Sequence, residues 1–262
     1  MKQSSKLSLV RGLYLFSMAL MIAAVPLSRY LMSVAQFSFA VLFLWEGAAF
    51  STITDKKNLT AKAAAFFMAV INNMLRKFKA FFSNTAALAF SSILLYSLLA
   101  TLYSADIPEA LRDMRNKLPF FLLSLYFSSA PPLSKAQVRN YLLLFIAAVA
   151  GGVIYSLIRL YHYQFEDVRL MTTFISHIRF SLNVCLAILI SIYFIISNKI
   201  KAGGLRMLLG AGILLMLFYL ITLRSFTGIY VLFFASGLMI LRHLFIIKRH
   251  KAALATLLLF IL

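Results

Sequence analysis

Acidic residues and cysteine are both scarce in this chain. Seven aspartates and glutamates stand against 26 lysines and arginines, and the one cysteine is Cys185. A single cysteine excludes an internal disulfide, and its place inside an apolar run indicates a small buried side chain. In a water-soluble protein this basic balance would suggest a nucleic-acid partner. Here we expect no nucleic acid, because the basic residues flank long apolar runs, where anionic lipid headgroups would meet them.

The common motifs of nucleotide, metal and acyl-transfer chemistry are also missing. The sequence has no Walker-type glycine loop, no G-x-G-x-x-G, no nucleophile elbow and no D-x-D-like acidic pair. His162 and His177 are 15 residues apart, and no short-range pattern of His, Cys or carboxylate joins them. The spacing therefore predicts no metal site. We expect chemistry that needs neither ATP nor a metal-bound nucleotide sugar, and no cofactor.

Long apolar runs take the place of these motifs. The chain is 63% hydrophobic and 13% charged, and 262 residues offer too little interior to bury all its runs in water. We predict an all-α fold, a polytopic transmembrane bundle that forms a single domain over residues 1–262. About 20 residues cross a hydrocarbon core of roughly 30 Å. We expect about nine spans, the last truncated in a chain that is incomplete at its C-terminus: 10–28, 30–53, 84–103, 118–133, 140–160, 180–197, 207–223, 228–247 and the start of one at 252–262.

Positive charge predicts the orientation of these spans. With a cytoplasmic N-terminus, 18 of the basic residues fall in cytoplasmic connections and eight fall outside, as the positive-inside rule favours. The eight outer residues are Arg29, Arg112, Arg115, Lys117, Arg159, Arg169, Arg179 and Arg224.

Residues 61–82 interrupt the pattern of spans. Their apolar stretch from Ala63 to Leu75 is short, and large apolar residues recur at helical spacing among basic ones such as Lys77. We predict an amphipathic helix on the cytoplasmic surface. Were it a span instead, every later connection would change sides.

Two extracytoplasmic loops, 104–117 and 161–179, carry secondary candidates for anion binding. In the first, Asp106 and Pro108 indicate a helix start, and Arg112 and Arg115 follow. The alternative is that these arginines pair with nearby acids or with lipid phosphates. The second loop, together with Arg159 just before it, is the most polar and aromatic part of the chain, and the candidates there are Arg159, His162, Arg169 and His177.

Two arginines lie where apolar segments meet the predicted outer side of the membrane. Arg179 belongs to Thr173-Phe-Ile-Ser-His-Ile-Arg-Phe-Ser-Leu182, and Arg224 belongs to Thr222-Leu-Arg-Ser-Phe-Thr-Gly228. Since arginine normally collects on the cytoplasmic side, arginines placed against that bias need a reason. A bound anion is the hypothesis we adopt, and snorkelling to headgroups is the alternative.

Together with Ser104-Ala-Asp-Ile-Pro-Glu-Ala-Leu111, these two motifs resemble the O-antigen ligase and polymerase family of bacterial envelope glycosyltransferases. The resemblance covers residues 84–250. It implies a protein of the bacterial inner membrane that takes part in lipopolysaccharide biosynthesis. It also implies transfer of a glycan from an undecaprenyl-diphosphate carrier to a saccharide acceptor, either the lipid A core or a growing glycan. Arg179 and Arg224 would contact the diphosphate. The family's loop histidine, the expected catalytic group, would lie beyond Leu262.

Two other classes of function remain open. A transporter or flippase would couple to ions through acids inside the membrane, and only Glu46 is even partly immersed. A scaffold without chemistry fits the composition but gives the outer arginines no role. The sequence does not distinguish ligase from polymerase, nor does it identify the sugar, the acceptor or the oligomeric state.

The charge distribution generates a topological prediction. In a background without Cys185, an impermeant thiol reagent should reach cysteines placed at Glu109 and Glu166 from outside the cell. It should not reach cysteines at Lys77 or Lys199, and outside labelling at residue 77 would contradict the arrangement.

Overall fold

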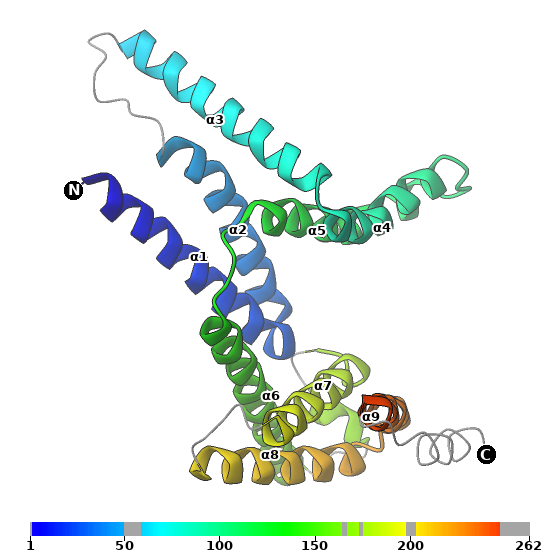
Figure 1. The fold of residues 1–262 in the computed structure, drawn as a ribbon. Coiled ribbons are helices and arrows are strands. Elements are labelled where there is room, and N and C mark those ends of the chain that lie inside the picture. Colours follow the sequence, from blue (N-terminus) through cyan, green and yellow to red (C-terminus); the bar gives the residue numbers. More distant parts are fainter. Residues whose placement is uncertain (1, 50–58, 164–166, 173–174, 198–202, 247–262) are drawn as a thin grey trace. The chain divides into compact units, whose positions relative to one another are not determined.

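The computed structural model describes residues 2–49, 59–163, 167–172, 175–197 and 203–246, and every regular element among them is helical (Figure 1). The all-α class is therefore confirmed. The elements are α1 (Lys2–Leu27), α2 (Arg29–Ala49), α3 (Leu59–Phe82), α4 (Thr85–Thr101), α5 (Ile107–Ser129), α6 (Lys135–Tyr163), the 3₁₀ helix η2 (Val168–Met171), α7 (His177–Ile196), α8 (Gly203–Thr222) and α9 (Phe226–Ile246).

The described helices long and apolar enough to cross a membrane are fewer than the nine spans predicted. Four qualify by length and composition, and a bent pair of helices raises the number to five. The four are Leu9–Leu27, Lys135–Tyr163, His177–Ile196 and Gly203–Thr222. The shorter apolar helices Arg29–Leu44 and Phe226–Arg242 fall below that length. The segment expected at 252–262 lies outside the described residues. Several apolar helices are nevertheless compatible with a membrane protein.

Most of the predicted loop 104–117 and of the predicted span 118–133 lies in one continuous helix, α5. Its start agrees with the sequence pattern, because the Asp106 carboxylate accepts a hydrogen bond from the Glu109 backbone N–H at 3.0 Å and Pro108 lies in the first turn. The apolar part of α5 therefore shares its helix with the charged turns from Arg112 to Lys117. That charge removes α5 from the candidate spans.

By its internal contacts the chain divides into two compact units: unit 1 comprises Met1–Met21 and Tyr30–Ser134, and unit 2 comprises Ile22–Arg29 and Lys135–Leu262. Aromatic rings hold α1, α2 and α5 together in unit 1. The Tyr126 ring centroid lies 5.4 Å from that of Tyr14 and 4.9 Å from that of Phe39. These separations are typical of favourable ring contacts.

Lys77 departs from the surface helix expected at 61–82. Its side chain is 2% exposed, its ammonium donates to the Phe43 carbonyl at 3.0 Å, and it lies 4.1 Å from the centre of the Phe43 ring. It thus fastens α3 to α2 and does not face lipid headgroups. A topological label belongs on the exposed Lys79, and Lys199 lies outside the described residues.

The helices α3 and α4 meet at an elbow. They bend by 94° at residues 83–84, where the Asn84 side chain caps α4 by accepting from the Ala87 N–H at 3.1 Å. A near right angle fits a surface helix followed by a helix that enters the bilayer. It equally fits a re-entrant loop or a broken span, so the cytoplasmic placement of 61–82 stays a prediction.

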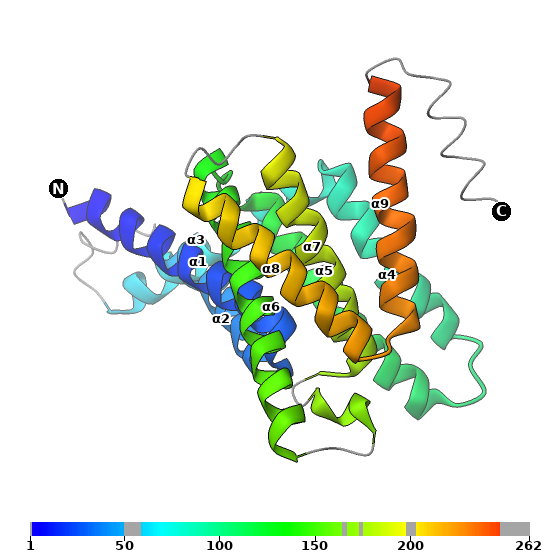
Figure 2. The same ribbon diagram turned by 90° about the horizontal axis from the view of Figure 1, so that it is seen from below.

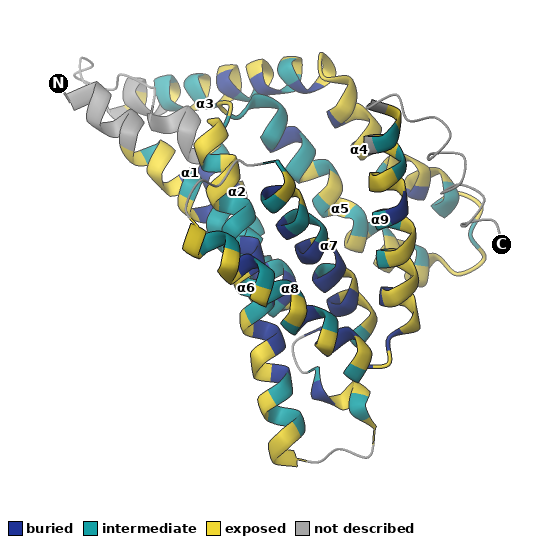
Figure 3. Cartoon of the chain, turned by 60° about the horizontal axis from the view of Figure 1, so that its bottom comes forward, coloured by how far each residue is buried: buried dark blue, intermediate teal, exposed yellow. Residues whose placement is uncertain are grey.

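α7 is the central helix of unit 2. It packs against α6, α8 and α9, and Figure 2 shows these helices gathered around it. Its buried positions form the dark stripe in Figure 3, and residues such as Val184, Ala187 and Ile188 are almost fully enclosed. The core is therefore built around one helix whose small and branched side chains admit three neighbours.

The paired glycines of α6 have different surroundings. A Cβ on Gly152 would lie 2.9 Å from Phe180 Cζ and 3.2 Å from Leu27 Cδ2, whereas a Cβ on Gly151 would meet nothing within 4 Å. Phe180 is itself buried and packs edge-on against Tyr219 with ring centroids 5.5 Å apart. Close packing against Phe180 and Leu27 therefore accounts for the glycine at position 152.

We therefore expect Gly152→Ala to lower the free energy of unfolding by roughly 1–3 kcal/mol, because the added methyl displaces a wedged ring. Gly151→Ala is the matched control and should leave stability unchanged or slightly raised, since alanine is the better helix former. Thermal unfolding in one detergent measures both variants. Equal stability of the two would show that α6 and α7 do not approach closely at residue 152.

Candidate functional site

Unit 2 brings the two arginine motifs together. The Ser225 hydroxyl donates to Ser181 Oγ at 2.9 Å, although 44 residues separate the two serines. One turn deeper, the Cys185 thiol donates to the Gly228 carbonyl at 3.0 Å. All of these groups are buried. The start of α7, with His177 and Arg179, therefore lies beside the start of α9, which Arg224 precedes.

Capping residues explain why both helices begin where they do. Ser176 caps α7 by accepting from the Arg179 N–H at 3.5 Å, and Ser225 is placed to cap α9 by accepting from the Gly228 N–H at 3.4 Å. Each helix start leaves backbone N–H groups directed outward along its axis. Two adjacent starts combine the positive ends of two helix dipoles.

The turn between α8 and α9 is short and holds Arg224 in an unusual conformation. Its φ is 51°, in the left-handed region that favours glycine, and its N–H donates to the Ile221 carbonyl at 3.0 Å. An L-residue in that region costs roughly 1–2 kcal/mol. The strain is tolerated because Leu223 before it and Ser225 after it are both buried and fixed. An arginine where glycine would fit better favours a role for its side chain.

Gly228 permits the close approach of α7 and α9. A Cβ at this position would lie 2.9 Å from Ser181 Cβ and 3.1 Å from Leu220 Cδ2. Ser181 Cβ belongs to a helix and has little freedom to move. A small residue here thus lets one helix backbone rest on the other, as is common between membrane helices.

Both guanidinium groups are available to a ligand. Arg179 and Arg224 are exposed, and neither side chain has a hydrogen-bond or ion-pair partner among the described residues. His177, the first residue of α7, is partly buried. Arginine remains charged and presents a planar fork of donors that suits phosphate oxygens. Two such forks beside two helix starts can hold an anion with more than one phosphate.

The other predicted residues lie apart from this arrangement or are already engaged. Arg159 donates to the Met171 carbonyl at 3.4 Å and lies 5.6 Å from the Tyr163 ring centre, so it ties η2 to α6. His162 and Arg169 are exposed, on α6 and η2. α6 runs on to Tyr163, so the predicted loop 161–179 begins within a helix.

Arg112 and Arg115, which the sequence predicts on the outer side, belong to unit 1. Arg112 pairs with Glu109 at 3.1 Å on the surface of α5, which is the structural alternative considered for it, and Arg115 is exposed nearby. Such exposed pairs contribute little stability. The side chains of Glu46 and Glu166 lie outside the described residues.

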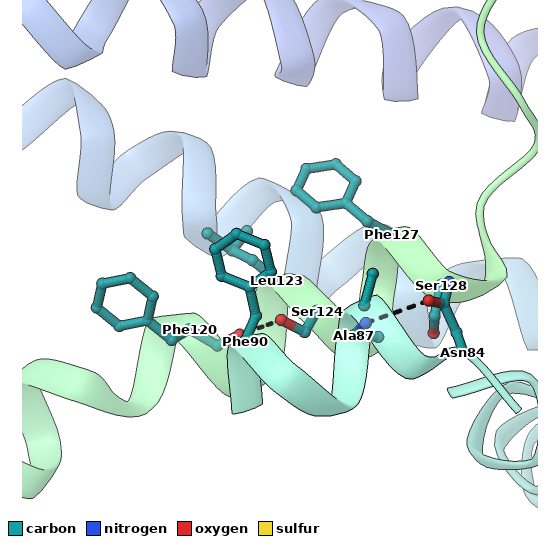
Figure 4. Close-up of a pocket in the computed structure, with 9 residues that line it drawn as sticks. Asn84, Ala87, Phe90, Phe120, Leu123, Ser124, Phe127 and Ser128 are labelled. Atoms are coloured by element: carbon teal, nitrogen blue, oxygen red, sulfur yellow. Dashed lines mark hydrogen bonds between the residues drawn. The ribbon is translucent and has the colours of Figure 1, made fainter. Parts of the chain in front are cut away.

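Within the described ranges, no three His, Cys, Asp or Glu residues gather closely enough to hold a metal ion. A cavity of about 380 Å³ between α4 and α5 lies in unit 1 and bears no charged side chain (Figure 4). Ser124 and Ser128, which line it, donate to backbone carbonyls at 2.6 and 2.9 Å. This cavity offers no obvious group for catalysis.

The sequence prediction gave no role to Ser181, Ser225 or Gly228, and it described Cys185 only as a small buried side chain, which the structure confirms. One signal was present, because Ser181 and Cys185 are four residues apart and therefore share a helix face made of small side chains. The identity of their partner has no local signature.

No family model, curated protein or solved structure matches this chain.

The left-handed residue generates a test in which two arginines behave oppositely. Arg224→Gly should raise the free energy of unfolding by roughly 0.5–1 kcal/mol, because glycine adopts φ of 51° without strain. Arg179→Gly, inside the first turn of α7, should lower it by a similar amount. Thermal unfolding in detergent compares them. A fall in stability for Arg224→Gly would mean that its side chain supports the fold.

Proposed function

We propose that the protein transfers a glycan, without a metal ion, from an undecaprenyl-diphosphate carrier to a saccharide acceptor at the outer face of the bacterial inner membrane. The observation that carries the proposal is the Ser225–Ser181 hydrogen bond of 2.9 Å. It joins the two helix starts that bear Arg179 and Arg224. The motif resemblance supplies the substrate class, and the geometry supports an anion with two phosphates.

The chain's own residues would act on the leaving group. In the reaction, the acceptor hydroxyl attacks the anomeric carbon, a new C–O bond forms, and the bond from that carbon to the diphosphate oxygen breaks. The electron pair leaves with the carrier diphosphate, where charge grows. Guanidinium donors stabilise that charge as it develops. The acceptor hydroxyl gives its proton to a general base, a role to which no residue of this chain is assigned.

A polyprenyl carrier also needs an apolar surface beside the charged site. Residues such as Ile178, Phe226 and Tyr230 are exposed near the two helix starts. A lipid tail could lie along them while the diphosphate meets the arginines. The acceptor would be the lipid A core for a ligase or the growing glycan for a polymerase, with the N-terminus cytoplasmic in either case.

A transporter or flippase for a lipid or small solute is the second candidate. The 94° bend between Ala64–Phe82 and Thr85–Thr101 favours it, since transporters often use broken or re-entrant helices. The two candidates share the anion site and differ in whether a covalent product appears.

The decisive variants replace each arginine by lysine. Lysine snorkels to headgroups equally well but cannot reproduce the planar two-donor fork. Losing one charge-assisted contact of about 1.5–3 kcal/mol predicts that Arg179→Lys and Arg224→Lys each reduce glycan transfer roughly 10- to 150-fold, with abundance unchanged. Transfer is measured with the full-length protein and a lipid-linked glycan in membranes.

Arg139→Lys is the matched control, since it alters an exposed arginine of α6 outside the proposed site and should leave transfer unchanged. Near-normal transfer by both test variants at matched protein levels would make the two arginines membrane anchors. Movement of the lipid-linked glycan across the bilayer without a covalent product would favour the transporter.

A further inference from the structure

We propose that the elbow between α3 and α4 is a binding site for one anionic phospholipid. Its phosphate would lie on Arg76 and Lys79, and an acyl chain would fill the apolar hollow next to Phe82. The site lies within unit 1 and does not rest on the proposed glycan transfer.

The hollow is suited to hydrocarbon. It measures about 460 Å³, within the range of small-molecule sites, and lies between the last turn of α3, α4 and the first half of α5. Phe82, Leu88, Leu95, Leu98 and Met114 are among the residues that line it. Its two serines are turned to their own helix: Ser91 donates to the Ala87 carbonyl at 2.8 Å and Ser92 to the Ala89 carbonyl at 2.7 Å. The lining therefore offers a ligand mostly apolar contact.

Two positively charged residues of α3, Arg76 and Lys79, precede the hollow along the helix. Arg76, Lys79 and Phe82 are spaced by three residues on α3, so they follow one another along the helix surface, and all three are exposed. Arg76 spends one donor on Asn73 Oδ1 at 2.8 Å, and the Lys79 ammonium has no partner among the described residues. α3 contains no acidic residue.

These features select an amphiphile that is negative at one end and apolar at the other. An anionic phospholipid has that form, and a membrane supplies it at high local concentration. A second copy of this chain is a poorer occupant, because it would need exposed acidic groups to pair with Arg76 and Lys79. The acids whose side chains the structure describes are engaged: Glu109 pairs with Arg112, Asp113 pairs with Lys117, and Asp106 and Asp167 cap helices.

The headgroup is tested with the purified full chain in a neutral detergent, freed of native lipid. Native mass spectrometry follows titration with phosphatidylglycerol or with phosphatidylcholine of the same acyl chains. We expect saturable binding of phosphatidylglycerol that is at least about tenfold tighter. The double variant Arg76→Gln, Lys79→Gln should raise the Kd for phosphatidylglycerol roughly 10- to 30-fold, since each of the two basic residues contributes a similar share of the attraction to an anionic headgroup.

The charge control is Lys135→Gln with Arg139→Gln, which removes two exposed charges from α6 and should leave the Kd unchanged. Equal binding of the two lipids, or an equal effect of the two double variants, would overturn the headgroup contact. An equal effect of the two double variants would mean that binding depends on net charge alone.

The acyl chain is tested by filling the hollow. Leu98 lines it and is 48% exposed, whereas neighbouring Leu99 is outside its lining and 51% exposed. Leu98→Trp should weaken phosphatidylglycerol binding at least about fivefold, and Leu99→Trp should not. Circular dichroism and elution volume verify that both fold. No effect of Leu98→Trp in a folded protein, or equally tight binding of glycerol phosphate without acyl chains, would overturn the proposal.

Discussion

The close contact between the starts of α7 and α9 is the constraint on which the candidate site depends. Gly228 allows the α9 backbone to lie against Ser181 Cβ, and the hydrogen bond from the Ser225 hydroxyl to Ser181 Oγ joins the two helix starts. In lipid, apolar side chains gain little by leaving the surroundings, so close packing of small residues and buried hydrogen bonds must hold such helices together. A larger side chain at position 228 would separate the helix starts and, with them, the two arginines.

The hydrogen bonds at this contact form a directed chain. The Gly228 N–H donates to Ser225 Oγ, Ser225 donates to Ser181 Oγ, and Ser181 donates to the Ile178 carbonyl at 2.8 Å. Each hydroxyl thus accepts one bond and donates one, which satisfies buried polar groups that would otherwise be costly. This series of hydrogen bonds begins at the Gly228 N–H, shortly after Arg224, and ends at the Ile178 carbonyl, next to Arg179. It fixes the backbones that carry both guanidinium groups while leaving the side chains exposed.

Local features of the fold were predictable where local chemistry decides them. Asp106 and Pro108 mark the start of α5, and the observed cap agrees. The number of membrane spans was overestimated because the length of an apolar run does not show what the rest of its helix contains. The apolar run at the end of α5, for example, belongs to a helix whose earlier turns are charged. Lys77 was misjudged for a related reason. A basic residue on an amphipathic helix is usually exposed, but here the Phe43 carbonyl and ring compensate its burial.

The sequence by itself determined the helical class, the apolar character compatible with a membrane, and the two arginine motifs beside apolar segments. These follow from composition and short-range pattern, which act within a few residues. Only the tertiary structure decided that Ser181 meets Ser225, that Gly152 and not Gly151 receives a ring, and that Arg224 adopts a left-handed turn. Each depends on a neighbour distant in the chain or on the exact path between two packed helices, and neither leaves a local signature.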